Sequence, residues 1–146
     1  MSAQPAPITI LMADDDEEDQ MLASEALEEA QLGNDLRFVN DGEELLAYLR
    51  RQGRYADAAS SPRPGLILLD LNMPRMNGIE FLRAVKQDEE LKSIPVVVLT
   101  TSTEEQDRVE SFDLGIAGYM IKPVDYRQFV DVVRTIDLYW TLSELP

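Results

Sequence analysis

The sequence predicts a doubly wound α/β domain built on a five-stranded parallel sheet. The length of the apolar runs and their alternation with helical segments carry this prediction. Five short apolar runs, each about four to six residues long, alternate with segments that have helical periodicity. Strands of this length that alternate with helices form βαβ units, in which helices cover both faces of a parallel sheet through right-handed crossovers.

The first half of the chain contributes two strands and two helices. Gly33-Asn34 is a typical stop signal for the first helix, and Asp41-Gly42 is a typical start for the second. The expected elements are a strand at about 8–13, an acidic helix near 17–31, a strand at 36–39, and a helix that opens at 41–42.

The stretch from Gly53 to Gly65 is rich in Ala, Ser and Pro and has no apolar periodicity. Such composition is typical of a long surface connection. We interpret it as a tolerated insertion, with a contribution to partner specificity as the alternative.

The second half contributes three further strands, each followed by a helix. The helix that starts at Gly78 carries Ile79, Leu82 and Val85 as its expected apolar face. The expected elements are a strand ending at Asp70, a loop over 74–78, the helix from Gly78, a strand ending at Thr100, a polar helix near 104–114, a strand leading to Lys122, and a helix at about 125–140.

Length and composition limit the possible functions. We expect one domain over residues 1–146, with a core at about 7–140 and a short tail at 141–146. The net charge of −15 disfavours nucleic acid and anionic membranes as partners. Cys and His are absent, so thiol and imidazole chemistry are excluded. No run reaches the roughly 20 apolar residues that span a bilayer, and no secretory signal is recognisable, so we expect a cytoplasmic protein.

Polar residues stand where four of the apolar runs end. The carboxyl ends of parallel strands meet at one edge of a sheet, where ligands bind. Three carboxylates, a hydroxyl and an ammonium at one edge suit Mg²⁺ and a phosphoryl group. These residues are Asp14, Asp15, Asp70, Thr100 and Lys122.

The first of these positions lies in a run of six acids at 14–19. Such a run is usually a solvated segment, and Asp16 and the acids after it are explained as the cap and first turn of a helix. Asp14 and Asp15 precede the cap, at the edge of the sheet. Because a carboxylate pair there needs a neutralising cation, we predict that both are metal ligands.

The remaining positions are less specific when each is taken alone. Asp70 could be a helix cap, Thr100 an ordinary strand residue, and Lys122 a solvated side chain. Beside an acidic pair, a carboxylate is a competent nucleophile toward phosphorus. Thr100 would then donate to a phosphoryl oxygen, and Lys122 would supply a positive charge.

With these residues in place, the chain resembles the receiver domain of two-component response regulators, the CheY-like family, over essentially its whole length. Four motifs occur in order at the expected spacing. They are Ile10-Leu11-Met12-Ala13-Asp14-Asp15-Asp16, Leu68-Leu69-Asp70-Leu71-Asn72-Met73-Pro74-Arg75-Met76-Asn77-Gly78, Val97-Val98-Leu99-Thr100, and Gly118-Tyr119-Met120-Ile121-Lys122-Pro123. One departure is Ala13, where Val or Ile is commoner.

The resemblance implies a flavodoxin-like (βα)₅ fold with strand order 2-1-3-4-5. It also implies that Asp70 is the phosphoacceptor, which receives a phosphoryl group from the phosphohistidine of a sensor histidine kinase or from a small phosphodonor. Mg²⁺ would be held directly by Asp15, Asp70 and the backbone carbonyl of Asn72, with Asp14 acting through water.

The resemblance further implies how the signal leaves the site. Lys122 would contact the phosphoryl group, and Thr100 would move toward it. Tyr119 occupies the aromatic switch position, whose rotation remodels the face built from the fourth helix, fifth strand and fifth helix.

Further motifs carry a finer likeness: Met21-Leu22 with Glu25-Ala26-Leu27, the long 53–65 connection, Leu99-Thr100-Thr101-Ser102, Asp113-Leu114-Gly115, and the tail from Leu138-Tyr139-Trp140 to Leu145-Pro146. In these the sequence is similar to single-domain regulators that are paired with phytochrome-type sensor kinases. This likeness implies a homodimer through the face just described and signalling by protein contact, with no DNA-binding output. It also implies that the protein is not an enzyme, because its only chemistry is self-phosphorylation and autodephosphorylation.

Three alternatives are weighed against this interpretation. A haloacid-dehalogenase-like phosphohydrolase would need an aspartate two residues after its nucleophile, where this chain has Asn72. A nucleotide-binding domain would need a glycine-rich turn after the first strand, where this chain has six acids. An interaction protein that is never phosphorylated is the third, and it predicts no loss of function in Asp70→Asn.

Overall fold

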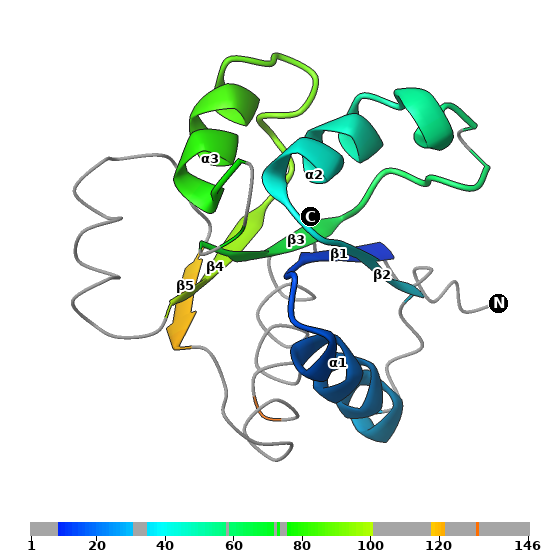
Figure 1. Ribbon diagram of the computed structural model, residues 1–146, viewed down its shortest axis with the longest axis vertical. Coiled ribbons are helices and arrows are strands. Elements are labelled where there is room, and N and C mark those ends of the chain that lie inside the picture. The colour runs from blue at the N-terminus through cyan, green and yellow to red at the C-terminus, as the bar shows by residue number, and fades with distance from the viewer. Residues whose placement is uncertain are drawn as a thin grey trace, which may run out of the picture.

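The fold is an open parallel sheet with helices on both faces (Figure 1). The computed structural model describes residues 9–30, 35–57, 59–71, 73, 76–100, 118–121 and 131. Its strands are β1 (Thr9–Ala13), β2 (Asp35–Val39), β3 (Leu66–Asp70), β4 (Val96–Thr100) and β5 (Gly118–Ile121). Its helices are α1 (Glu17–Ala30), α2 (Gly42–Leu49), the short 3₁₀ helix η1 (Gly53–Tyr55) and α3 (Gly78–Lys86).

The five strands are parallel and stand in the order β2-β1-β3-β4-β5, which confirms the predicted topology. β1 lies between β2 and β3, with Ala13 paired to Val39 on one side and to Leu69 on the other. β3 pairs with β4 so that Asp70 lies opposite Leu99. The ends of β1, β3 and β4 therefore meet at one edge of the sheet.

Two apolar cores lie on the two faces of the sheet, because successive side chains of a strand point to opposite faces. Leu11 and Ala13 pack with α2 and α3, whereas Ile10 and Met12 pack with α1. Figure 1 shows the same layers, with α2 and α3 on one side of the sheet and α1 on the other.

Each described α-helix begins at a polar side chain that accepts a backbone N–H. Asp16 accepts the N–H of Glu18 at 2.8 Å, which confirms the predicted cap of α1. Asp41 accepts the N–H of Glu44 at 2.8 Å at the start of α2. Asn77 and Glu80 form a reciprocal capping box at the start of α3.

The structure differs from the sequence prediction at α3. Phe81 is fully buried together with Leu82 and Val85, whereas Ile79 is only partly buried. Residues 81, 82 and 85 are spaced to lie on one face of a helix, so the spacing fits Phe81 at least as well as Ile79.

The connection over 53–65 also differs from the patternless insertion we expected. It begins with η1, and Ser61 and Pro64 are buried. The Tyr48 hydroxyl of α2 donates to the Pro62 carbonyl at 2.8 Å. The segment is thus attached to α2.

The helices expected near 104–114 and at about 125–140 lie outside the described residues, except for Asp131, which is helical. No helix within the described ranges is both long enough and apolar enough to cross a bilayer.

Candidate functional site

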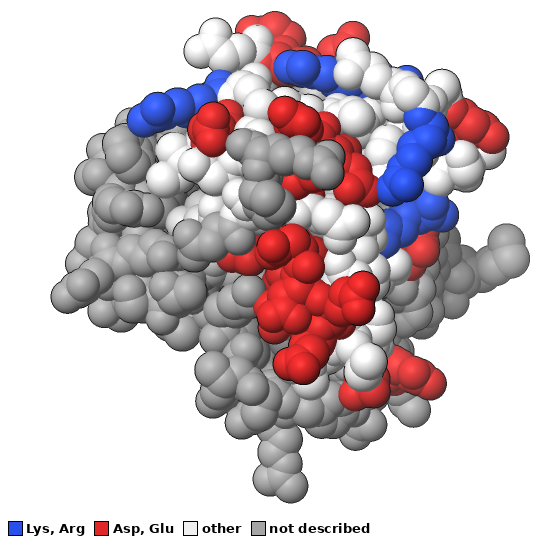
Figure 2. All heavy atoms as spheres, viewed as in Figure 1, with Lys and Arg blue, Asp and Glu red and all other residues white. Residues whose placement is uncertain are grey.

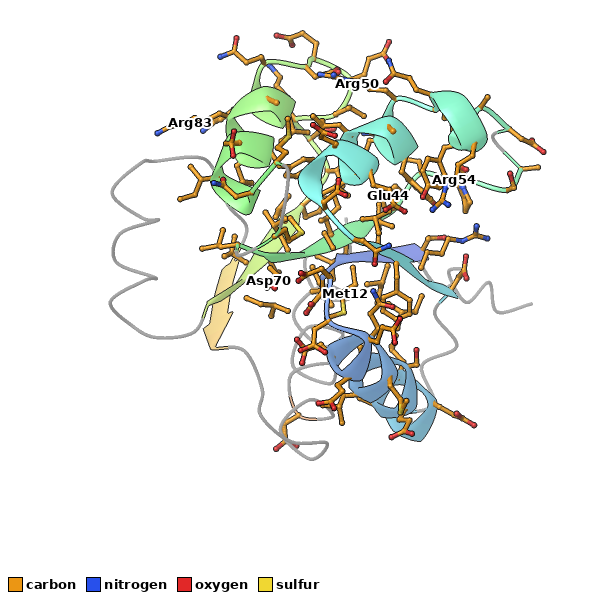
Figure 3. The ribbon with its side chains drawn as sticks, in the orientation of Figure 1. Met12, Glu44, Arg50, Arg54, Asp70 and Arg83 are labelled. Atoms are coloured by element: carbon orange, nitrogen blue, oxygen red, sulfur yellow. The ribbon has the colours of Figure 1, made fainter. Side chains whose placement is uncertain are left out.

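Three carboxylates meet at the carboxyl edge of the sheet, as the sequence predicted. Asp14, Asp15 and Asp70 each place a carboxylate oxygen within 4.8 Å of the others. The Asp14 and Asp70 side chains are almost fully buried, at 0% and 3% exposure, and Asp15 is exposed. The cluster therefore combines two buried carboxylates with one that is open to solvent, at Asp15. Figure 3 labels Asp70 at the end of β3.

The register of the sheet explains why these residues meet. Ala13 of β1 pairs with Leu69 of β3, so the residue that follows each of them reaches the same edge. Those residues are Asp14 and Asp70. Asp15 is the next residue along the chain, just before α1.

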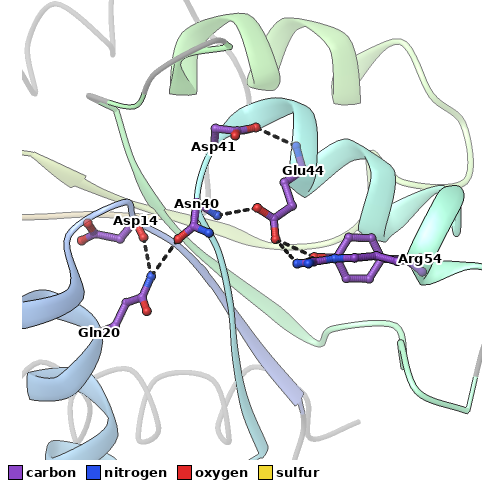
Figure 4. Close-up of polar contacts among 7 residues, drawn as sticks. Asp14, Gln20, Asn40, Asp41, Glu44 and Arg54 are labelled. Carbon is purple, nitrogen blue, oxygen red and sulfur yellow. Dashed lines mark hydrogen bonds and ion pairs between the residues drawn. The ribbon is translucent and has the colours of Figure 1, made fainter.

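Backbone and amide contacts fix the position of Asp14. Its N–H donates to the Val39 carbonyl at 3.0 Å, and its Oδ1 accepts the Asp16 N–H at 2.9 Å. The Gln20 side-chain amide donates to the Asp14 carbonyl at 2.8 Å and to Asn40 Oδ1 at 3.2 Å (Figure 4). Asp14 is thus held from both α1 and the end of β2.

Two glycines hold the segment that follows Asp70. The Gly78 N–H donates to the Leu71 carbonyl at 3.1 Å, and the Gly42 N–H donates to the Met76 carbonyl at 2.9 Å. A Cβ atom at Gly42 would lie 2.5 Å from the Met76 carbonyl oxygen, so a larger residue would force these two backbone segments apart. The start of α2 therefore contacts the loop between Asp70 and α3 directly.

The donor set fits a hard divalent cation. All three groups offer carboxylate oxygens, which are the ligands that Mg²⁺ and Mn²⁺ prefer over nitrogen or sulfur. Three like charges this close repel one another, and two of them are buried. A cation at this point would offset that repulsion.

Other acids surround the cluster. Asp16, Glu17 and Glu18 are exposed at the start of α1. Figure 2 shows acidic side chains gathered over this end of α1, whereas Lys and Arg lie toward α2 and α3. These exposed charges on the first turn of α1 are all negative, which favours cations at this edge.

The structure brings together Asp14, Asp15 and Asp70 of the predicted site residues. Thr100 is the last residue of β4, beside β3, and Tyr119 lies in β5, paired with Val98. Asn72 and Lys122 lie outside the described residues. The roles predicted for these seven residues remain predictions.

Sequence reasoning missed Gln20, Asn40 and Gly42 at this site. Asp41-Gly42 was interpreted only as a helix start, although Gly at the first position of a helix is a signal of close approach. Nothing in the sequence pairs Gln20 with Asn40, because that contact depends on how α1 packs beside the end of β2.

The chain is similar to known proteins over most of its length. Residues 10–134 match the family model described as the response regulator receiver domain. Response regulator Rcp1 of Synechocystis sp. is 40% identical over 134 residues, which cover 92% of this chain and 89% of that protein.

Two solved structures are similar in both fold and sequence. The phosphorylated cyanobacterial phytochrome response regulator RcpA has a TM-score of 0.83 and 40% identity, covering 96% of this chain and 98% of that one. The Mn²⁺-bound form of response regulator Rcp1 has a TM-score of 0.78 and 38% identity, with the same coverage.

Proposed function

The chain belongs to the response regulator receiver domain family, and we propose on that basis that it is a phosphoacceptor switch in two-component signalling. Asp70 accepts a phosphoryl group from the phosphohistidine of a sensor histidine kinase. The observation that carries the proposal is the burial of Asp70 at the edge of the sheet, within 4.8 Å of the Asp14 and Asp15 carboxylates.

The chemical step takes place on Asp70. A carboxylate oxygen of Asp70 attacks phosphorus, the phosphorus–nitrogen bond of the donor breaks, and an acyl phosphate forms as the imidazole leaves. When bound, Mg²⁺ supplies charge neutralisation between the carboxylates and the phosphoryl oxygens. Asp14, Asp15, Asp70 and the Asn72 carbonyl would hold it.

The other residues of the proposed mechanism act on the product. Lys122 pairs with a phosphoryl oxygen, and Thr100 donates its hydroxyl to another. The position of Thr100 at the end of β4, beside β3, supports this role. Tyr119 then shifts with Thr100, so that the two states of the protein present different surfaces.

Partners follow from the relatives. The likeness to a phytochrome response regulator supports a phytochrome-type kinase as the phosphodonor. We propose that the chain acts in the cytoplasm as a homodimer, through β5 and the helices expected on either side of it. Its signal passes by protein contact, without nucleic acid, and its chemistry is confined to itself, so it is not an enzyme.

The decisive experiment is intact mass spectrometry after incubation with acetyl phosphate and Mg²⁺. Wild type should gain one phosphoryl group, and Asp70→Asn should gain none. Asp88→Asn is the matched control, because it removes the same charge at the far end of α3, where Asp88 pairs with Arg50, and should be phosphorylated as wild type.

Two results would contradict the proposal. Phosphoryl uptake by Asp70→Asn would place the acceptor elsewhere in the chain. An absence of uptake in wild type, with acetyl phosphate and with a cognate kinase alike, would favour the interaction protein that is never phosphorylated.

A further inference from the structure

The turn between β2 and α2, residues 39–42, contacts both sides of the acidic cluster. On one side, the Val39 carbonyl accepts the Asp14 N–H, and Asn40 shares the Gln20 amide with the Asp14 carbonyl. On the other side, the Gly42 N–H donates to the Met76 carbonyl, in the loop that follows Asp70. A shift of this turn would therefore move both sides of the cluster.

Glu44 connects this turn to η1 (Figure 4). Its Oε2 accepts the Asn40 N–H at 3.1 Å. Its Oε1 accepts the Tyr55 hydroxyl at 2.5 Å and the Arg54 guanidinium at 2.6 Å. The Glu44 side chain is only 18% exposed, and hydrogen bonds to a charged acceptor shielded from water are stronger than neutral ones.

Of the two η1 partners, Tyr55 is the less exposed. The Arg54 side chain is 72% exposed, and exposed ion pairs contribute little. The Tyr55 ring is partly buried and packs on the Tyr48 ring of α2, with centroids 5.1 Å apart. Tyr55 therefore presents its hydroxyl to Glu44 from a fixed position.

We propose that Glu44 and Tyr55 are positioning residues for the metal-binding edge. Tyr55 orients Glu44, Glu44 holds the turn at 39–42, and the turn holds Asp14 and the loop after Asp70. The connection over 53–65 thereby tunes metal affinity from outside the site. This inference rests on the metal-binding part of the proposed function, and it does not require phosphoryl transfer.

The test is calorimetric titration of Mg²⁺ into the full-length chain, with the thermal midpoint recorded for each variant. Tyr55→Phe removes one hydroxyl and keeps the ring on Tyr48. We expect its Kd for Mg²⁺ to rise roughly two- to fivefold, which is less than the roughly 10- to 100-fold typical of residues that contact a metal ligand directly. Glu44→Ala should raise the Kd further.

Tyr48→Phe is the matched control. It also removes one tyrosine hydroxyl, but that hydroxyl donates to the Pro62 carbonyl and not to Glu44. We expect Tyr48→Phe to lower the thermal midpoint while the Kd stays at the wild-type value. An equal rise of the Kd in both tyrosine variants would show a general loss of structure and would overturn the inference.

A double variant tests the route. In a Glu44→Ala background, Tyr55→Phe should cause no further rise of the Kd, because its effect passes through Glu44. The inference would be overturned if Tyr55→Phe raised the Kd in the Glu44→Ala background as much as it does in wild type. It would also be overturned if Tyr55→Phe alone left the Kd at the wild-type value. The Mg²⁺ titrations contain no phosphodonor. If the separate acetyl phosphate experiment showed no phosphorylation, that result would contradict the proposed function and leave the titration results unchanged.

Discussion

Asp14 and Asp70 present carboxylate oxygens within 4.8 Å of each other from neighbouring strands, and both side chains are almost completely buried. Their proximity follows from the parallel register in which Ala13 faces Leu69. The third acid, Asp15, is exposed. It can therefore be replaced with little disturbance of packing, and this makes it the most informative position for mutation.

Mg²⁺ should stabilise the folded chain through Asp15. A ligand at about 100 times its Kd adds about 2.7 kcal/mol to the free energy of unfolding. If Asp15→Asn weakens binding tenfold, about 1.3 kcal/mol of this gain should be lost. Urea unfolding in Mg²⁺ and in EDTA measures the gain. Asp16→Asn is the control, because Asn also caps a helix, and an equal loss in that variant would contradict the assignment of Asp15.

The same variant should behave in the opposite way without metal. Asp15→Asn removes one of three converging negative charges, and two charges about 4 Å apart in water repel by about 1 kcal/mol. In EDTA at low salt, its free energy of unfolding should exceed that of wild type by up to about 1 kcal/mol. The difference should shrink as salt is added. A variant that is less stable than wild type in EDTA would refute this expectation.

Gly42→Ala should disturb the site through the backbone. The new Cβ would meet the Met76 carbonyl oxygen at 2.5 Å, and such overpacking costs about 1–3 kcal/mol. The stabilisation by Mg²⁺ should fall as well, because Met76 lies in the loop after Asp70.

Ala47→Gly provides the comparison for that variant. It weakens the same helix by about 1 kcal/mol at a partly buried position in the second half of α2, away from the Met76 contact. Denaturant unfolding with and without Mg²⁺ should show the metal effect intact in Ala47→Gly and reduced in Gly42→Ala. Equal metal effects in the two variants would argue against a role for the Gly42 contact.

The capping box of α3 should contribute measurably to stability. Asn77 accepts the Glu80 N–H at 2.9 Å, and Glu80 accepts the Asn77 N–H at 3.2 Å. Asn77→Ala should lower the free energy of unfolding by about 1 kcal/mol, and Asn77→Asp should retain most of it. Urea midpoints for the two variants test this, and identical midpoints would mean that the cap is not what stabilises the helix.

Stability should fall at alkaline pH because of Tyr48. Burial raises the pKa of the Tyr48 hydroxyl above its ordinary value of about 10, although Arg37 acts in the opposite direction. Above that pH the unfolded chain loses this proton while the folded chain keeps it, so the free energy of unfolding decreases as pH rises. Between pH 9 and 11, Tyr48→Phe should show a shallower decrease than wild type in denaturant unfolding. Parallel curves would contradict the prediction.

Much of the fold could be predicted from the sequence because its signals are local. The apolar runs coincide with β1 to β5. Asp14, Asp15 and Asp70 follow the ends of two of these runs, and so they could be placed at one edge of the sheet. The strand order came from family resemblance, since apolar periodicity does not encode which strands become neighbours.

The remaining features depend on tertiary contact. The contact between Gly42 and Met76 joins segments that are more than 30 residues apart in the sequence. The 53–65 connection is held because Tyr55 contacts both Tyr48 and Glu44. Composition alone made that connection resemble an insertion. Its polar and small residues do not reveal that Ser61 and Pro64 are buried.

In the function proposed above, the six acids at 14–19 should make phosphorylation selective among phosphodonors. Small phosphodonors such as acetyl phosphate are anions, so these acidic side chains repel them. The repulsion acts over about one Debye length, which is about 10 Å at 0.1 M salt. A docking protein that presents cationic side chains approaches with the field and arrives faster. The same negative charge that favours a metal ion would then slow phosphorylation by small anionic metabolites relative to phosphorylation by a docked protein. Raising the ionic strength should reduce the difference between these two rates.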